Sequence, residues 1–223
     1  MRSPGGPKPG RQLVGALVLA LWPGVGSGAQ NYSFKTYTQE SGLANVAMNS
    51  IAQDAAGYIW AGTQAGLYRY DGSRFRQIGD RSNMASLDVQ AVAAAPDGSL
   101  WAGTRSGLTL VHGERVEAIH TSVPFEILGE SSLAVDGAGR LYAASAAGLL
   151  RLEHDARGGF HENWISRQPS SGVQIQADGS VWFGCAQDVC RMEASGVVTA
   201  QSSRARIASV ILFDQTGEFF SDY

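Results

Sequence analysis

The sequence predicts an all-β fold made of repeated four-stranded antiparallel blades. The first observation is a repeat, because "GYIWAGTQAGLYRYDG" at residues 57–72 is followed 41 positions later by "GSLWAGTRSGLTLVHG". The second is that no stretch after residue 29 shows the long 3.6-residue apolar period of a helix. The third is a composition of 44% hydrophobic and 17% charged residues, which suits a packed core. A period of about 40–50 residues built from short strands is typical of a β-propeller.

Each copy of the repeat is centred on an aromatic residue three positions after a turn glycine. The glycines are Gly57, Gly98, Gly139, Gly179 and Gly217, and the aromatics are Trp60, Trp101, Tyr142, Trp182 and Phe220. The spacing predicts four complete blades and a partial fifth within a β-propeller domain at residues 30–223. Because the chain ends after the second strand of the fifth copy, we expect an incomplete ring from a longer protein. A closed five-bladed ring is the alternative.

The first copy predicts the order of strands within a blade. We expect strands at residues 49–54, 58–63, 67–71 and 74–78. The segment "FKTY", which starts at Phe34, aligns with the fourth of these strands. It therefore predicts an outer strand that completes a blade other than the first.

The repeated residues are expected to have structural roles. Glycine at the turn between the first and second strands permits a positive φ, and a nearby aspartate can accept backbone N–H bonds. The adjacent apolar pairs, such as Ile59-Trp60, make a strand apolar on both faces, which neighbouring blades must cover. We expect the aromatic to fill the wedge between blades. The residues assigned this structural role are Gly57, Trp60, Gly98, Trp101, Gly139, Tyr142, Gly179 and Trp182.

Residues 1–29 are predicted to be a signal peptide. They hold basic residues at the start, the apolar run "LVGALVLALW" and small residues up to Ala29, where cleavage is expected. A disordered N-terminus is the alternative. Three of the 17 basic residues and none of the 20 acidic ones lie there, so residues 30–223 carry a net charge of −6. That acidity argues against a nucleic-acid partner.

The two cysteines, Cys185 and Cys190, flank the four residues "AQDV". If this stretch is a hairpin loop, the two side chains lie at bridging distance, and an oxidising compartment permits a disulfide. The short loop predicts local rather than global stabilisation. Two unpaired, small apolar residues are the alternative. Without a nearby histidine the pair makes a poor metal site, and we predict no metal and no cofactor.

The stretch "SGLANVAMNSIAQDAAGYIWAGTQAGLYRYDG" resembles the two-component regulator propeller repeat family. The matching residues are Gly42, Leu43, Asp54, Gly57, Trp60, Gly62, Thr63, Gly66, Leu67, Tyr70 and Asp71. The resemblance implies a periplasmic sensor region of a membrane signalling protein, followed by a further propeller part, a membrane segment and an output domain. The output domain of such proteins is a histidine kinase or a GGDEF-type diguanylate cyclase, and "VWFGCAQDVCR" looks more like the cyclase-linked branch. The full-length parent would be anchored in the inner membrane, and this chain would not itself be an enzyme.

A search for catalytic chemistry finds no established motif. The histidines, His112, His120, His154 and His161, share no spacing and are interpreted as solvated surface residues. We expect a small-molecule or glycan ligand to meet the variable connections at residues 79–88 and 120–132. The alternative function is a secreted propeller hydrolase or lyase acting on glycans, for which sialidases and streptogramin lyases provide analogies.

Overall fold

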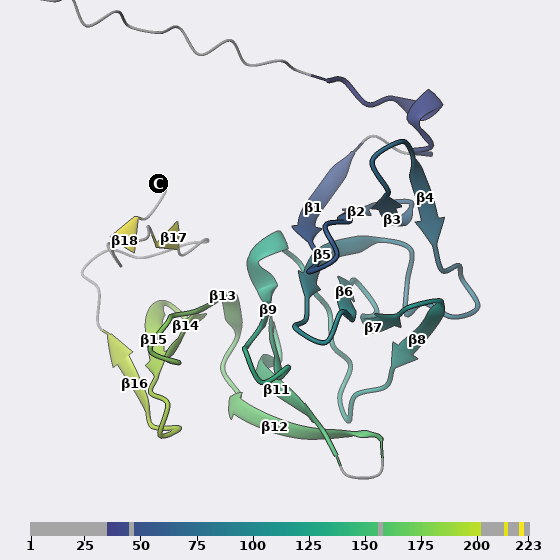
Figure 1. Cartoon of the computed structure of the whole chain (residues 1–223). Coiled ribbons are helices and arrows are strands. Elements are labelled where there is room, and N and C mark those ends of the chain that lie inside the picture. The colour runs from purple at the N-terminus through teal and green to yellow at the C-terminus, as the bar shows by residue number, and fades with distance from the viewer. Residues whose placement is uncertain (1–34, 45–46, 156–157, 202–211, 214–218, 221–223) are drawn as a thin grey trace, which may run out of the picture. The chain divides into compact units, whose positions relative to one another are not determined.

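The computed structural model describes residues 35–44, 47–155, 158–201, 212–213 and 219–220 (Figure 1). The predicted signal peptide at residues 1–29 lies outside the described residues. Within the described ranges the chain is nearly all strand, with two three-residue 3-10 helices, η1 (Gln39–Ser41) and η2 (Glu130–Ser132). The predicted all-β fold is therefore confirmed.

Each of the first four repeats forms one four-stranded antiparallel sheet, as predicted. The first sheet contains β1 (Met48–Gln53), β2 (Ile59–Thr63), β3 (Gly66–Tyr70) and β4 (Phe75–Ile78). The second contains β5 (Val89–Ala94), β6 (Leu100–Thr104), β7 (Gly107–His112) and β8 (Arg115–Ile119). The third contains β9 (Leu133–Val135), β10 (Leu141–Ser145), β11 (Gly148–His154) and β12 (Phe160–Ser166). The fourth contains β13 (Ser170–Ile175), β14 (Val181–Cys185), β15 (Asp188–Met192) and β16 (Val198–Gln201). In each sheet, consecutive strands are hydrogen-bonded neighbours, so each sheet is one blade.

The two ends of the predicted repeat differ from the four blades. β17 (Leu212–Phe213) pairs with β18 (Phe219–Phe220) as a two-stranded sheet where the fifth copy lies, and its assignment to a partial fifth blade stays a prediction. Residues 35–37 form no strand, contrary to the outer strand expected from Phe34. Tyr37 instead packs edge-on against Tyr70 and Phe75, with ring centroids 5.1 and 5.5 Å apart. Aromatic burial against the first blade thus takes the place of strand pairing.

Consecutive blades share apolar cores that contain the repeated aromatic residues. Trp60, 4% exposed, belongs to a cluster with Val89 and Leu100 of the second blade. Trp101, 2% exposed, clusters with Leu141 of the third. Tyr142, Val173 and Val181 form the corresponding cluster between the third and fourth blades, whereas Trp182 is half-buried. The wedge aromatics therefore bridge one blade to the next, and an aromatic buries about 150–250 Å².

The turn between the first and second strands of each blade is organised by its aspartate. In the first blade, Asp54 Oδ1 accepts hydrogen bonds from the N–H groups of Ala56 and Tyr58, each 3.0 Å long. Its Oδ2 accepts a 2.7 Å bond from Trp60 Nε1, which ties the turn to the wedge aromatic. Gly57 has a φ of 88°, a value that side chains with a Cβ disfavour.

The hairpin between the second and third strands differs in the fourth blade. In the first blade, the Thr63 hydroxyl donates to Gly66 O at 2.9 Å and accepts from Ala65 N at 3.0 Å. In the fourth blade, Cys185 occupies the equivalent position and is bonded to Cys190, with a Cα–Cα distance of 5.8 Å. The register pairs Cys185 with Asp188, so the bridge runs diagonally rather than between directly opposite residues. Ala186 of this turn has a φ of 54°.

Candidate functional site

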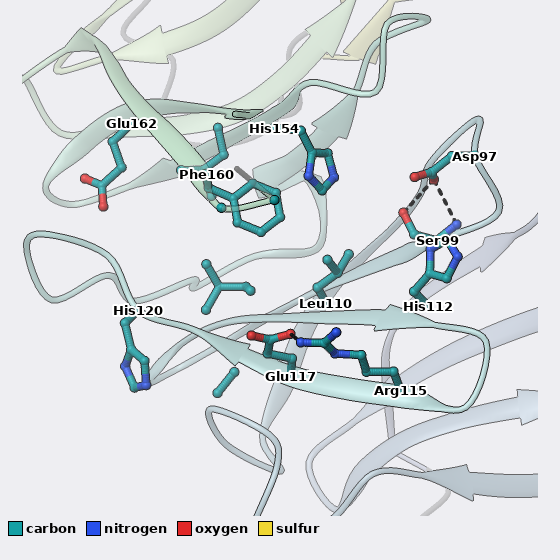
Figure 2. Close-up of a pocket in the computed structure, with 15 residues that line it drawn as sticks. Asp97, Ser99, Leu110, His112, Arg115, Glu117, His120, His154, Phe160 and Glu162 are labelled. Atoms are coloured by element: carbon teal, nitrogen blue, oxygen red, sulfur yellow. Dashed lines mark hydrogen bonds and ion pairs between the residues drawn. The ribbon is translucent and has the colours of Figure 1, made fainter. Parts of the chain in front are cut away.

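A cleft of about 500 Å³ opens between the facing surfaces of the second and third blades (Figure 2). We call it the wedge cleft. Its volume falls within the range of about 300–1,000 Å³ that is usual for small-molecule sites. Its lining consists of Asp97, Ser99, Leu110, His112, Arg115, Glu117, Ala118, Ile119, His120, Leu152, His154, Gly158, Gly159, Phe160 and Glu162.

The floor of the wedge cleft is apolar. Leu110 of β7 and Phe160 of β12 pack against the core cluster that the second and third blades share. The Phe160 ring lies 5.2 Å from Trp101 and 4.5 Å from His154, measured between ring centroids. Figure 2 shows the Phe160 and Leu110 side chains between the polar groups of the two blades. A ligand in the cleft would therefore lie against hydrocarbon while its polar ends meet the rim.

The rim of the wedge cleft carries carboxylates that already have partners in the protein. Glu117 on β8 forms an ion pair with Arg115, with Oε2 and Nη2 2.7 Å apart. Glu162 on β12 accepts hydrogen bonds from both the backbone N–H and the hydroxyl of Ser122. This second contact joins the third blade to the connection that follows β8.

Asp97 lies at the end of the cleft formed by the β5–β6 turn. Its Oδ1 accepts from Ser99 N at 3.0 Å and from Ser99 Oγ at 2.6 Å. Although burial opposes ionisation, these hydrogen bonds outweigh it and lower the pKa of Asp97. His112 and His154 lower this pKa further through electrostatic attraction. Asp97 is therefore negatively charged at neutral pH.

Three of the four histidines converge on the wedge cleft. His112 ends β7, His154 ends β11, and His120 follows β8. All three are exposed, in agreement with their interpretation as surface residues, and within the described ranges none makes a hydrogen bond. His161 is exposed and lies outside the cleft. The sequence signal that was missed is that His112 and His154 both close the third strand of their blades.

The connections at residues 79–88 and 120–132 line three further hollows. One, of about 400 Å³, is formed mainly by residues 84–88 with Arg81, and a second, of about 250 Å³, by residues 119–125. Both of these include Ser106 of the β6–β7 turn, whereas a third, of about 310 Å³, is lined by residues 128–132 together with residues of β10 and β13. The second shares Ile119 and His120 with the wedge cleft.

The eight repeat residues predicted to be structural do not line the wedge cleft. Within the described ranges, no group of three or more His, Cys, Asp or Glu side chains is placed to hold a metal ion. In that same part of the chain, no helix is long and apolar enough to span a bilayer.

Comparison with protein families identifies which residues carry the resemblance seen in the sequence. Residues 42–65 match the model of the two component regulator propeller family, in agreement with the resemblance seen in the sequence. These residues include Asp54, Gly57 and Trp60, whose contacts hold the first blade's turn. No curated protein matches the chain in sequence.

Several solved structures share the fold. The extracellular domain of a putative hybrid two component system from B. thetaiotaomicron aligns over 83% of this chain and 28% of its own, with 18% identity and a TM-score of 0.65. Virginiamycin B lyase from Staphylococcus aureus aligns over 77% of this chain and 62% of its own, with 15% identity and a TM-score of 0.61. A gluconolactonase from Xanthomonas campestris aligns over 78% of this chain and 69% of its own, with 14% identity and a TM-score of 0.56. The chain thus spans less than two thirds of the first two proteins, and these likenesses establish the fold alone, because one fold can serve unrelated functions.

Proposed function

We propose that this chain is the ligand-sensing β-propeller part of the periplasmic region of a transmembrane signalling protein. The observation that carries the proposal is the two component regulator propeller repeat at residues 42–65. The fold shared with the extracellular domain of a putative hybrid two component system supports it. The output would be a histidine kinase or a diguanylate cyclase in the full-length parent.

The wedge cleft is the site that we assign to the ligand. Its two walls belong to different blades, and Glu162 already links the third blade to the connection after β8 through Ser122. A ligand that contacts both walls would therefore favour one relative position of the blades, and its binding energy sets the largest shift it can produce. The signal would pass from there to a partner or to further segments of the parent.

A thermal-shift screen of metabolites against the purified chain tests this function. We expect at least one class of small molecule to raise the Tm, because a ligand that binds only the folded state stabilises it. Glu162→Gln should reduce that shift, whereas His161→Gln, outside the cleft, should not. If every hit keeps its full shift in variants of the cleft and the loop hollows alike, the sensing role is contradicted.

A second candidate is a secreted propeller lyase or hydrolase acting on glycans. It is favoured by imidazoles and carboxylates around one cleft, since such pairs can act as general acid and base. The likeness to a lyase and a gluconolactonase is consistent with it. Turnover of glycans by the purified chain, lost in His154→Ala, would support this candidate over the sensor.

A further inference from the structure

The second and fourth blades contain the same turn. Asp178 Oδ1 accepts from Ser180 N at 2.9 Å and from Ser180 Oγ at 2.6 Å. Asp97 and Ser99 make the equivalent bonds at 3.0 and 2.6 Å. Both aspartates directly precede the turn glycine. The two blades therefore present equivalent carboxylates, and differences in their surroundings can be compared position by position.

The blades differ at the residue opposite the wedge aromatic. In the fourth blade Trp182 is paired with Arg191 across the sheet, whereas in the second blade Trp101 is paired with Leu110. The Arg191 guanidinium lies 3.1 Å from Asp178 Oδ2 and 5.5 Å from the centroid of the Trp182 ring. Arginine also occupies this position in the other two blades, as Arg69 and Arg151. The second blade is thus the one described blade without this arginine.

In the fourth blade this arginine is the partner of the second oxygen of the turn aspartate, and in the second blade no arginine takes that place beside Asp97. The other turn aspartates use Oδ2 to accept from Trp60 Nε1, Arg140 Nε or Arg191 Nη2. Asp97 Oδ2 accepts no hydrogen bond from the described residues. Asp97 and Leu110 both line the wedge cleft, so the space beside them is where the equivalent guanidinium would lie.

We propose that the wedge cleft binds an organic cation, a guanidinium or ammonium group on a short apolar chain, whose charged head pairs with Asp97. The head would take the place that Arg191 holds in the fourth blade, and the chain would lie against Leu110 and Phe160. This inference deepens the proposed function, on which it rests for the biological role of the ligand.

The charges of the cleft favour a cation over an anion. Among the described lining residues, Asp97, Glu117 and Glu162 are acidic, and Arg115 is the one guanidinium. These carboxylates and the guanidinium together give the lining two net negative charges. Arg115 is held by Glu117 on its own strand, and so it does not neutralise Asp97. A charge-assisted hydrogen bond to a carboxylate is about twice as strong as a neutral one.

Calorimetric titration with butylguanidine and butylurea tests the inference. The two probes have similar shapes, and only the first is charged at pH 7.5. We expect butylguanidine to bind about tenfold more tightly than butylurea, and about tenfold less tightly to Asp97→Asn. Asp178→Asn is the matched control in the fourth blade and should keep wild-type affinity. Leu110→Arg supplies the missing guanidinium from the chain itself and should abolish binding.

The outcomes separate the two proposals. Equal binding of butylguanidine and butylurea, or unchanged butylguanidine binding in both Asp97→Asn and Leu110→Arg, overturns the cation site. If another class of ligand from the thermal-shift screen binds and is displaced by Leu110→Arg, the cation assignment is wrong while the sensing function stands. Circular dichroism of each variant verifies that the blades remain folded.

Discussion

The wedge between the first and second blades is filled to its outer edge, whereas the wedge between the second and third is open there. In the first wedge, Ile78 of β4, Met84 of the following connection and Val116 of β8 pack together with Trp60. In the second wedge, the outer strands contribute Glu117 and Glu162, which line a cleft instead of a core. Both wedges keep a buried tryptophan near their centre.

The difference between the filled and the open wedge shows that the repeat contains two kinds of position, those that fix blade packing and those that vary between copies. Repeated residues such as Trp60 and Trp101 fix the packing of one blade on the next. Positions on the third and fourth strands, where the copies differ, decide whether a wedge is core or cleft. Strand β8 illustrates this directly, because Val116 faces the filled wedge and its neighbour Glu117 faces the open one.

The largest expected effect concerns the tryptophan that closes the base of the open wedge. Trp101→Ala should lower the free energy of unfolding by about 3–5 kcal/mol, because it removes a fully buried aromatic that clusters with the third blade. Trp182→Ala, at a half-buried position, should cost clearly less. Urea denaturation of both variants measures the difference, and equal losses would contradict the bridging role of Trp101.

The turn aspartates provide a smaller contrast between the two wedges. Asp54→Ala should cost about 3 kcal/mol, because it removes two backbone hydrogen bonds and leaves the Trp60 indole N–H without its partner. Asp97→Ala should cost about 1 kcal/mol, since Asp97 bonds only to Ser99 among the described residues. Thermal and urea unfolding give the ranking, and a larger loss for Asp97→Ala would refute it.

The hairpin turns extend the comparison to the fourth blade. Replacing both Cys185 and Cys190 by serine should cost at most about 2 kcal/mol, because the bridge closes a loop of only a few residues. The effect should be local, with faster amide exchange in β14 and β15 and little change in the first blade. Faster exchange spread evenly over all four blades would contradict this.

The smallest expected effect is at Ala186 of the same turn. Its φ of 54° lies in the left-handed region that favours glycine. Ala186→Gly should therefore raise the free energy of unfolding by about 0.5–1 kcal/mol, less the entropy that glycine adds to the unfolded chain. Ala65→Gly, in the equivalent turn of the first blade, is the control and should not stabilise.

The sequence predicts the blades because the residues that form them recur. Trp60 and Trp101 share their spacing, and the strands of the first copy lie within one residue of their predicted bounds. The candidate site could not be predicted in the same way, because it depends on positions at which the copies of the repeat differ. The cleft arises from side chains of two blades, and Leu110 stands out only once the register places it opposite Trp101.

The histidines show the same limit. His112 and His154 have no common sequence spacing, yet each ends the third strand of its blade and both influence Asp97. Strand ends of neighbouring blades come together only through packing, which one sequence does not report. The outer strand predicted from Phe34 is not seen in residues 35–37 for a related reason, since Tyr37 packs on Tyr70 by aromatic contact instead.

The central claim, that the second blade lacks the arginine that would pair with Asp97, is tested most directly by a double-mutant cycle between positions 97 and 110. Unfolding free energies of the wild type, Leu110→Arg, Asp97→Asn and the double variant give the coupling between the new guanidinium and the carboxylate. We predict a favourable coupling of about 0.5–1 kcal/mol, as for other partly exposed ion pairs. A coupling of zero would mean that an arginine at position 110 does not interact with the Asp97 carboxylate. It would contradict the claim that this position is where the missing guanidinium would lie.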